Sequence, residues 1–189
     1  MNKQKQVYVF LSPGFEEIEA ITPVDILRRG GIDVKIVSIT KELYVQGAHN
    51  IKVACDCILD EILDLSLPDA IIFPGGMPGA TNLANCVELK DFSKKCLAES
   101  KLICAICASP AIVFGAYDLL KNKKWTCYPN MENNAPKEAQ NFWCKNSVVV
   151  DGKLISSRGP GTASLFAYTI LEELGEKEKA QSLKEAMLF

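Results

Sequence analysis

Short apolar runs alternate with amphipathic segments along most of the chain. The runs with the length and composition of buried β-strands are 7–12, 33–39, 69–76 and 101–106. The segments with helical periodicity are 16–30, about 80–100, a stretch from Ser109 onward, 162–175 and 176–189. Two further segments read as hairpins, 44–59 around Gly47 and 148–157 around an Asp-Gly turn. Strands that alternate with helices predict an α/β fold, a mostly parallel sheet with helices on both faces.

Composition narrows the class of protein. The 189 residues are 48% hydrophobic and 23% charged, which suits a single domain over 1–189 with a full-sized core. A net charge of −2 provides no basic field for nucleic acid or an anionic membrane, and no apolar stretch approaches the roughly 20 residues that span a bilayer. We therefore expect no nucleic-acid and no membrane partner.

The cysteines point to a reducing compartment. No export signal is recognisable, so we expect a cytoplasmic protein whose eight cysteines are reduced. His49 is the only histidine, and no second CxxC or CxxH pair exists, so we expect no zinc site. The Cys-Asp-Cys at 55–57 is an isolated pair and more typical of strand composition than of a metal site.

Polar and glycine-rich segments follow three of the predicted strands. They are SPGFEE after 7–11, PGGMPGA from 74, and CASP from 107. In open parallel sheets, ligands bind just beyond the carboxyl ends of the strands. We therefore expect the chemistry of the protein where these three strand ends meet.

Cys107 lies where a predicted strand gives way to a helix. Ser109 is a suitable N-cap, and Pro110 is favoured at the first helical position. A thiol at this place faces unpaired backbone N–H groups and the positive end of the helix dipole, so we expect its pKa to be lowered toward a reactive thiolate. The alternative is that Cys107 is a small buried hydrophobic residue, as most free cysteines are.

Small neighbours make this turn similar to a nucleophile elbow. Ala105 and Ser109 flank the cysteine at minus two and plus two, as small residues do in G-x-S-x-G. Such a turn supplies an oxyanion donor from Ala108, and Gly76 on a neighbouring strand end could supply a second. Cys104 lies inside the strand and is expected to be plain core.

Glu19 is the candidate partner of the cysteine. It falls on the apolar flank of the helix 16–30, where burial would raise its pKa and let it hold or donate a proton. The alternative is that Glu16, Glu17 and Glu19 all favour the first turns of a helix through the dipole, an interpretation that suffices for Glu16 and Glu17. His49 is interpreted as a solvated turn histidine.

Five ordered motifs, GFEEIEA, PVDILRRGG, PGGMPGA, ICAICASP and SSRGPGT, resemble the ThiJ/PfpI superfamily, in the branch that contains the Parkinsonism-associated deglycase. The likeness covers essentially the whole chain. It implies a flavodoxin-like three-layer sandwich, a homodimer, a reactive Cys107, a protonated Glu19, and amides of Gly76 and Ala108 facing the thiol. Tyr128 stands where several relatives have a histidine, so base catalysis by imidazole is not expected.

Three functions are compatible with these residues. The first is a glutathione-independent glyoxalase, or a protein deglycase, which acts on methylglyoxal-type dicarbonyls or glycated proteins through Cys107 and Glu19 without cofactor or metal. The second is a redox-sensing cytoprotective protein or chaperone that is regulated by oxidation of the same cysteine. The third and weaker one is a cysteine peptidase. The sequence leaves open whether Tyr128 or His49 assists Cys107.

Overall fold

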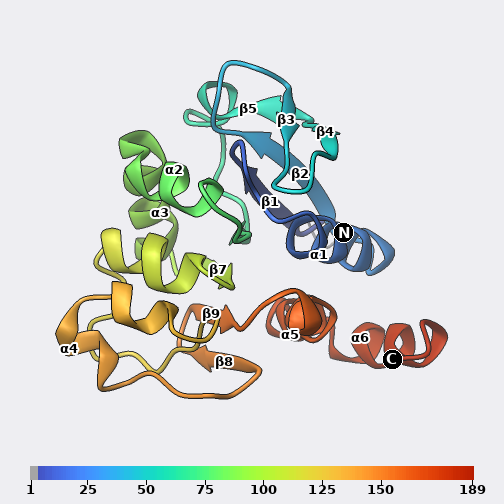
Figure 1. Ribbon diagram of the computed structural model, residues 1–189. Helices are drawn as coiled ribbons and strands as arrows, with labels where there is room; N and C mark the ends of the chain where they lie inside the picture. Colours follow the sequence, from blue (N-terminus) through green and yellow to red (C-terminus); the bar gives the residue numbers. More distant parts are fainter. Residues whose placement is uncertain (1–3) are drawn as a thin grey trace.

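A seven-stranded sheet forms the middle layer of the protein, for which a computed structural model describes residues 4–189 (Figure 1). In their order across the sheet, the strands are β5 (Cys57–Ile58), β2 (Asp33–Ser38), β1 (Gln6–Leu11), β6 (Ala70–Phe73), β7 (Leu102–Ile106), β9 (Leu154–Ser157) and β8 (Val148–Asp151). Neighbouring strands pair in parallel except β8, which runs antiparallel to β9. The predicted α/β class with a mostly parallel sheet is confirmed.

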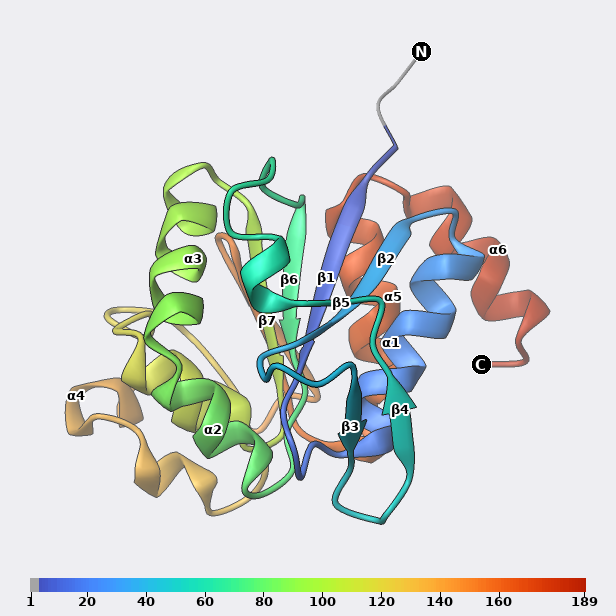
Figure 2. The ribbon, with the colours of Figure 1, turned by 90° about the horizontal axis from the view of Figure 1, so that it is seen from above.

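Helices cover both faces of this sheet (Figure 2). On one side lie α1 (Glu17–Arg29), α5 (Ala163–Glu173) and α6 (Lys177–Ala186). On the other lie α2 (Gly79–Asn85), α3 (Val87–Ala98), a helical turn at Pro110–Phe114 and the short α4 (Lys137–Gln140). Three-residue or four-residue 3₁₀ turns occur at Leu59–Glu61, Met131–Asn134 and Pro160–Thr162. The result is the three-layer arrangement that the sequence predicts.

Alternation along β1 explains why both faces are covered. Val7, Val9 and Leu11 belong to the core cluster shared with α1 and α5, whereas Tyr8 and Phe10 belong to the cluster shared with α3. All five side chains are at most 1% exposed. A strand that is apolar on both faces must be enclosed by two layers, which is why β1 lies near the centre of the sheet.

Two predicted elements differ in extent. The expected hairpin ends early: β3 (Tyr44–Gln46) pairs with β4 (Lys52–Ala54), and β5 then joins the main sheet beside β2. Asp56 causes this change of partner, because its backbone N–H donates to Ile36 and its carboxylate accepts the Ile36 N–H at 2.7 Å. The expected helix near 80–100 is two helices, separated at Cys86, whose backbone is extended.

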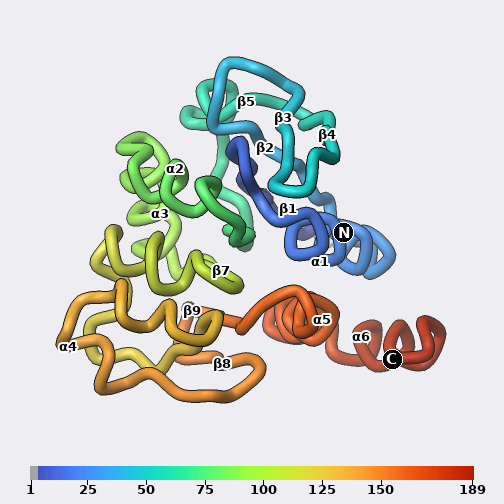
Figure 3. Tube along the Cα trace, viewed as in Figure 1, coloured from blue at the N-terminus to red at the C-terminus, as the bar shows by residue number. Residues whose placement is uncertain are grey.

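The order of strands places the reversal of the chain at β1. The chain leaves β1 for β2 and β5 on one side and then returns to add β6, β7 and β9 on the other, a path that Figure 3 follows. Ligand sites in open α/β sheets lie beyond the carboxyl ends of the strands at such a reversal. The segments in that position are 12–16, 74–76 and 107–109.

Candidate active site

Cys107 stands in a constrained backbone position at the end of β7. Its φ of +65° is in the left-handed region, which non-glycine residues rarely adopt. Its N–H donates to the carbonyl of Ser157 at 3.0 Å, and its carbonyl accepts the N–H of Tyr128 at 2.9 Å. The strand-to-helix turn predicted for Cys107 is therefore present, and hydrogen bonds to two other segments fix it.

Ser109 does not cap the helix that follows, contrary to the prediction. Its own backbone is helical, and no hydrogen bond joins its side chain to the first turn. The hydroxyl instead donates to the carbonyl of Pro74 at 2.6 Å, which ties the turn after β7 to the end of β6. Pro110 does occupy the start of the helical turn, as expected. The serine thus fixes the distance between two strand ends.

Glu19 reaches the cysteine from the first turns of α1. Its side chain is fully buried, and Oε2 accepts the N–H of Gly75 at 2.9 Å. A Cβ on Gly75 would lie 2.7 Å from both Cys107 Cβ and Glu19 Oε2, so the glycine marks the place where the two side chains meet. Burial raises the pKa of Glu19 from 4.5 to about 7. The structure therefore brings Cys107 and Glu19 together, as the sequence predicts.

The pKa of the Cys107 thiol is raised above its ordinary value, in the direction opposite to the expected lowering. Burial and the negative charge of the neighbouring Glu19 carboxylate raise the pKa of Cys107. The N–H groups of Ala108 and Gly76 act in the opposite direction but are outweighed. The reason is that a desolvated sulfur beside an ionisable carboxyl gains more from donating a hydrogen bond than from becoming a second anion.

Backbone donors converge on the sulfur from two strand ends. The Ala108 and Gly76 N–H groups both act on the Cys107 thiol in the direction that lowers its pKa. Gly76 has a φ of +87°, and a Cβ there would approach Glu16 N and Gly14 O to 2.5 Å, so no other residue fits. The two predicted donors are in place. Gly75, which binds Glu19, was not foreseen, because a Pro-Gly-Gly motif does not reveal which glycine faces which partner.

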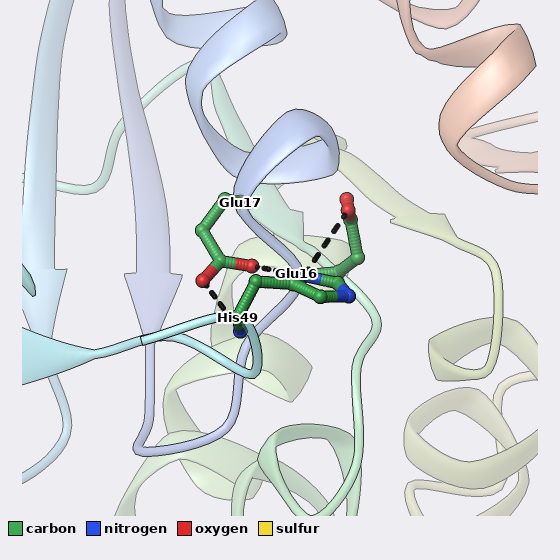
Figure 4. A group of neighbouring side chains, drawn as sticks. All are labelled: Glu16, Glu17 and His49. Atoms are coloured by element: carbon green, nitrogen blue, oxygen red, sulfur yellow. Dashed lines mark hydrogen bonds and ion pairs between the residues drawn. The ribbon is translucent and has the colours of Figure 1, made fainter. Parts of the chain in front are cut away.

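His49 is held by Glu17 in the β3–β4 loop (Figure 4). The Glu17 carboxylate accepts the His49 N–H at 2.7 Å and lies 2.8 Å from Nδ1, and this contact raises the pKa of His49 and lowers that of Glu17. The imidazole is 68% exposed, as expected for a histidine in a solvated turn, but its contact with Glu17 holds it in place. Glu16 caps α1 by accepting the Glu19 N–H at 2.7 Å.

Glu16, Glu17 and His49 have ligand atoms within 4.8 Å of one another, the one grouping of this kind in residues 4–189. Their hydrogen bonds already account for their positions. Glu17 is 6% exposed, and its carboxylate accepts N–H groups of His49 and Ile51 in the β3–β4 loop. The helix dipole alone therefore does not explain a glutamate at this position.

Cys104 is a core residue, as predicted. It is fully buried in β7, and burial raises its pKa well above the ordinary value. Alternation along the strand places it in the cluster that faces α1 and α5.

A pocket of about 240 Å³ lies beside the cysteine turn. Its lining residues are Tyr128, Pro129, Ser147, Arg158, Gly159, Pro160, Gly161 and Thr162. Gly159 joins it to the buried pair, because a Cβ there would be 3.2 Å from the Tyr128 ring and 3.9 Å from Glu19 Oε1. Oε1 itself is buried and has no hydrogen-bond partner among the described residues.

A flavodoxin-like sandwich with a cysteine on a strained strand-to-helix turn and a buried glutamate beside it defines a recognisable class of α/β protein. The model of the DJ-1/PfpI family matches residues 5–173, and the chain belongs to this family. The resemblance noted from the five sequence motifs is thereby confirmed.

Relatives are similar along nearly the whole chain. Protein DJ-1 homolog B of Arabidopsis thaliana is 41% identical over 93% of this chain, but the match spans only 40% of that longer protein. The glutathione-independent glyoxalase DJR-1.2 of Caenorhabditis elegans is 34% identical over 97% of this chain and 96% of its own length. The solved structure of oxidized Toxoplasma gondii DJ-1 is 33% identical, covers 98% of both chains and superposes with a TM-score of 0.92, which confirms the fold.

Among the described residues, no helix has the length and apolar character required to cross a bilayer.

Proposed function

We propose that the protein is a glyoxalase or protein deglycase that acts on methylglyoxal-type dicarbonyls through Cys107 and Glu19. The observation that carries this proposal is that Cys107 and the buried Glu19 carboxyl meet at Gly75, where an added Cβ would lie 2.7 Å from each side chain, and that the pKa of Glu19 is about 7. A base with a pKa near the working pH is best suited to take up and return a proton in one cycle. The C. elegans relative named a glutathione-independent glyoxalase supports the same assignment.

The thiol is activated at the moment of attack. Cys107 sulfur adds to the aldehyde carbon of methylglyoxal while its proton passes to the Glu19 carboxylate. The aldehyde oxygen becomes an oxyanion that the N–H groups of Gly76 and Ala108 stabilise, and it then takes the proton back from Glu19, which gives a hemithioacetal and restores the Glu19 carboxylate. Because the resting thiol is neutral and Glu19 is the base, the raised pKa of Cys107 is compatible with this step.

Glu19 then moves a proton between the two substrate carbons. The carboxylate removes the hydrogen from the former aldehyde carbon, which gives an enediolate. The proton of the former aldehyde hydroxyl passes to the neighbouring oxygen, and Glu19 returns its proton to the adjacent carbon, which produces a lactoyl thioester on Cys107. Water hydrolyses the thioester to lactate and restores the thiol. One methylglyoxal and one water give one lactic acid, and every proton transfer uses groups of this chain, with no metal or cofactor needed.

A lactate assay on matched cysteine variants tests this function. Cys107→Ala is expected to abolish lactate formation from methylglyoxal, and Glu19→Gln to reduce kcat by about 10² to 10⁴, the usual contribution of a positioned acid or base. Cys104→Ala, in β7 three residues before the nucleophile, is the control and should retain turnover. The stereochemistry of the lactate reports whether the protonation occurs on one face. Unchanged turnover in Cys107→Ala would refute the proposal.

Oxidation of Cys107 is the second candidate function. A protonated Glu19 and the amides of Gly76 and Ala108 could all donate hydrogen bonds to a sulfinate at this position, and the T. gondii relative is described as oxidized. The thiol would consume two hydrogen peroxide molecules and release two waters. A selective gain of two oxygen atoms at Cys107 by intact mass, together with negligible dicarbonyl turnover, would favour a redox sensor or regulated chaperone.

A cysteine peptidase is the weakest candidate. The N–H of Tyr128 binds the Cys107 carbonyl, so a histidine at position 128 would be next to the nucleophile, and this chain has tyrosine there. His49 is engaged by Glu17. The proposed chemistry requires a reduced thiol, and we accordingly infer the cytoplasm as the compartment.

A homodimer is also part of the proposal. Ile18 and Ile21 of α1 and Ile51 of the adjacent β3–β4 hairpin are 53%, 39% and 57% exposed, and the Ile51 N–H lies 3.4 Å from Glu17 Oε1. Apolar side chains grouped on one surface favour association with a second copy. Sedimentation of Ile18→Glu, expected to be monomeric, against the wild type tests this surface.

A further inference from the structure

The pocket beside Gly159 is lined by an arginine that has no carboxylate partner among the residues that the structure describes. Arg158 has no carboxylate oxygen within 4.0 Å among residues 4–189, whereas Arg28 binds Asp56 and Arg29 binds Asp25. Its Nε is buried without a hydrogen-bond partner, and Nη1 has only a long contact, 3.4 Å, to the Lys145 carbonyl. The terminal nitrogens of a guanidinium that lines a pocket and lacks a carboxylate can bind an anion there.

Two hydroxyl groups in the same pocket also have free hydrogen-bonding capacity. Neither the Tyr128 hydroxyl nor the Ser147 hydroxyl forms a hydrogen bond within the part of the chain that the structure describes, and both residues line the pocket with Arg158. The Thr162 hydroxyl, in contrast, is engaged with Ser157 and Gly159. Guanidinium and hydroxyl donors around one space form a binding site suited to a carboxylate or another oxyanion.

The charges nearby limit where an anion can lie. Glu19 is negative above pH 7 and is separated from the pocket by Gly159, so an anionic group is favoured toward Arg158 and disfavoured beside the thiol. Glu132 and Arg158 both act on the buried Cys127, one raising its pKa and the other lowering it, yet the two side chains do not form an ion pair. Among the described residues, the Arg158 guanidinium thus lines the pocket without an ion pair to a carboxylate.

We propose that this pocket binds the anionic end of the substrate, so that the protein prefers 2-oxoaldehydes carrying a carboxylate to neutral methylglyoxal. This inference rests on the proposed function, because it places the aldehyde at Cys107 and the carboxylate at Arg158. A volume of about 240 Å³ accommodates a chain of a few carbons beyond the reacting carbonyls. Tyr128 then acts in substrate binding at the position where relatives have a histidine.

Paired substrates test the preference directly. We expect the acid 4,5-dioxopentanoate to react with a specificity constant about tenfold higher than that of its neutral methyl ester, the effect of one charge-assisted hydrogen bond. In Arg158→Gln this ratio should fall to about one, while Arg158→Lys keeps part of it. Lys145→Gln, which removes a neighbouring positive charge but leaves the guanidinium, should keep the wild-type ratio. An equal ratio in the wild type and Arg158→Gln would overturn the proposal.

A binding experiment without turnover separates the pocket from the reaction. The probe is 4-oxopentanoate, which has the ketone and carboxylate but no aldehyde. It should slow the alkylation of Cys107 by iodoacetamide in the wild type and not in Arg158→Gln, with its methyl ester ineffective in both. Protection without any lactate formation from methylglyoxal would keep the anion pocket and refute the glyoxalase. Lactate formation from methylglyoxal, with no protection of Cys107 by 4-oxopentanoate and no preference for the acid over the ester, would keep the glyoxalase and refute the anion pocket.

Discussion

Replacing Glu19 by glutamine should stabilise the protein in a pH-dependent manner. The buried carboxyl has a pKa of about 7 in the folded state and 4.5 as the ordinary value. Between these two values the unfolded chain has released its proton while the folded chain still holds it, so the free energy of unfolding falls as pH rises. Above pH 7 the carboxyl is ionised in both states, and its effect on the free energy of unfolding no longer changes. Glutamine, neutral at every pH, avoids this loss.

The size of the effect follows from the two pKa values. Each pKa unit corresponds to about 1.4 kcal/mol, so a change from 4.5 to about 7 amounts to about 3 kcal/mol, an order-of-magnitude value. Such an amount is a large part of the roughly 5 to 15 kcal/mol that typically stabilises a domain. Glutamine can still accept the Gly75 N–H through its amide oxygen, so the packing of α1 against the end of β6 is retained.

Urea unfolding of the wild type and Glu19→Gln at pH 5, 6, 7 and 8 measures this difference. The two proteins should be similar at pH 5, and the variant should be more stable by about 3 kcal/mol at pH 8. The Glu17–His49 pair is present in both proteins, so its effect cancels in the difference between their free energies of unfolding. Glu138→Gln, which neutralises an exposed carboxyl, controls for the loss of one negative charge. A difference that does not change between pH 5 and pH 8 would refute the assignment of a raised pKa to Glu19.

Three further predictions concern the groups that hold the site. Gly75→Ala should abolish activity and destabilise the fold, measured by lactate formation and thermal unfolding, because the added methyl overlaps Cys107 and Glu19. Ser109→Ala should lower the free energy of unfolding in urea by about 1 kcal/mol through loss of the bond to the end of β6, and an unchanged midpoint would contradict this. His49→Gln should lower the Tm more at pH 6 than at pH 9, since the contribution of a raised histidine pKa is present below 6.5 and disappears as pH rises through the raised value.

Much of the fold could be predicted from sequence because its strands are apolar on both faces. β1, β6 and β7 are short runs enclosed between two layers, and this pattern alone indicates a parallel sheet. What the pattern could not reveal is the change of partner at Asp56, where one side chain redirects the strand that follows into the main sheet. A long-range hydrogen bond of this kind leaves no periodic signal.

The candidate site was only partly predictable for a similar reason. Cys107 and Glu19 were found because a strand-to-helix turn and an acid on an apolar helical flank are local features. The direction in which the pKa of the Cys107 thiol shifts could not be predicted in this way. It depends on the contact with Glu19, far away in the chain, whereas the helix-dipole argument considers only the helix that follows the cysteine. The contact between His49 and Glu17, 32 residues apart, was equally invisible.

The hydrogen bonds of the Cys107 main chain have a consequence for how the protein responds to a ligand. With its N–H committed to Ser157 and its carbonyl to Tyr128, the residue can change only by rotation about the Cα–Cβ bond. Little conformational entropy remains to be lost when the sulfur approaches a carbonyl carbon, which favours reaction. The same rigidity means that the cysteine cannot follow a poorly fitting molecule, so adaptation to different ligands must come from the side chains around it, such as the half-exposed Tyr128.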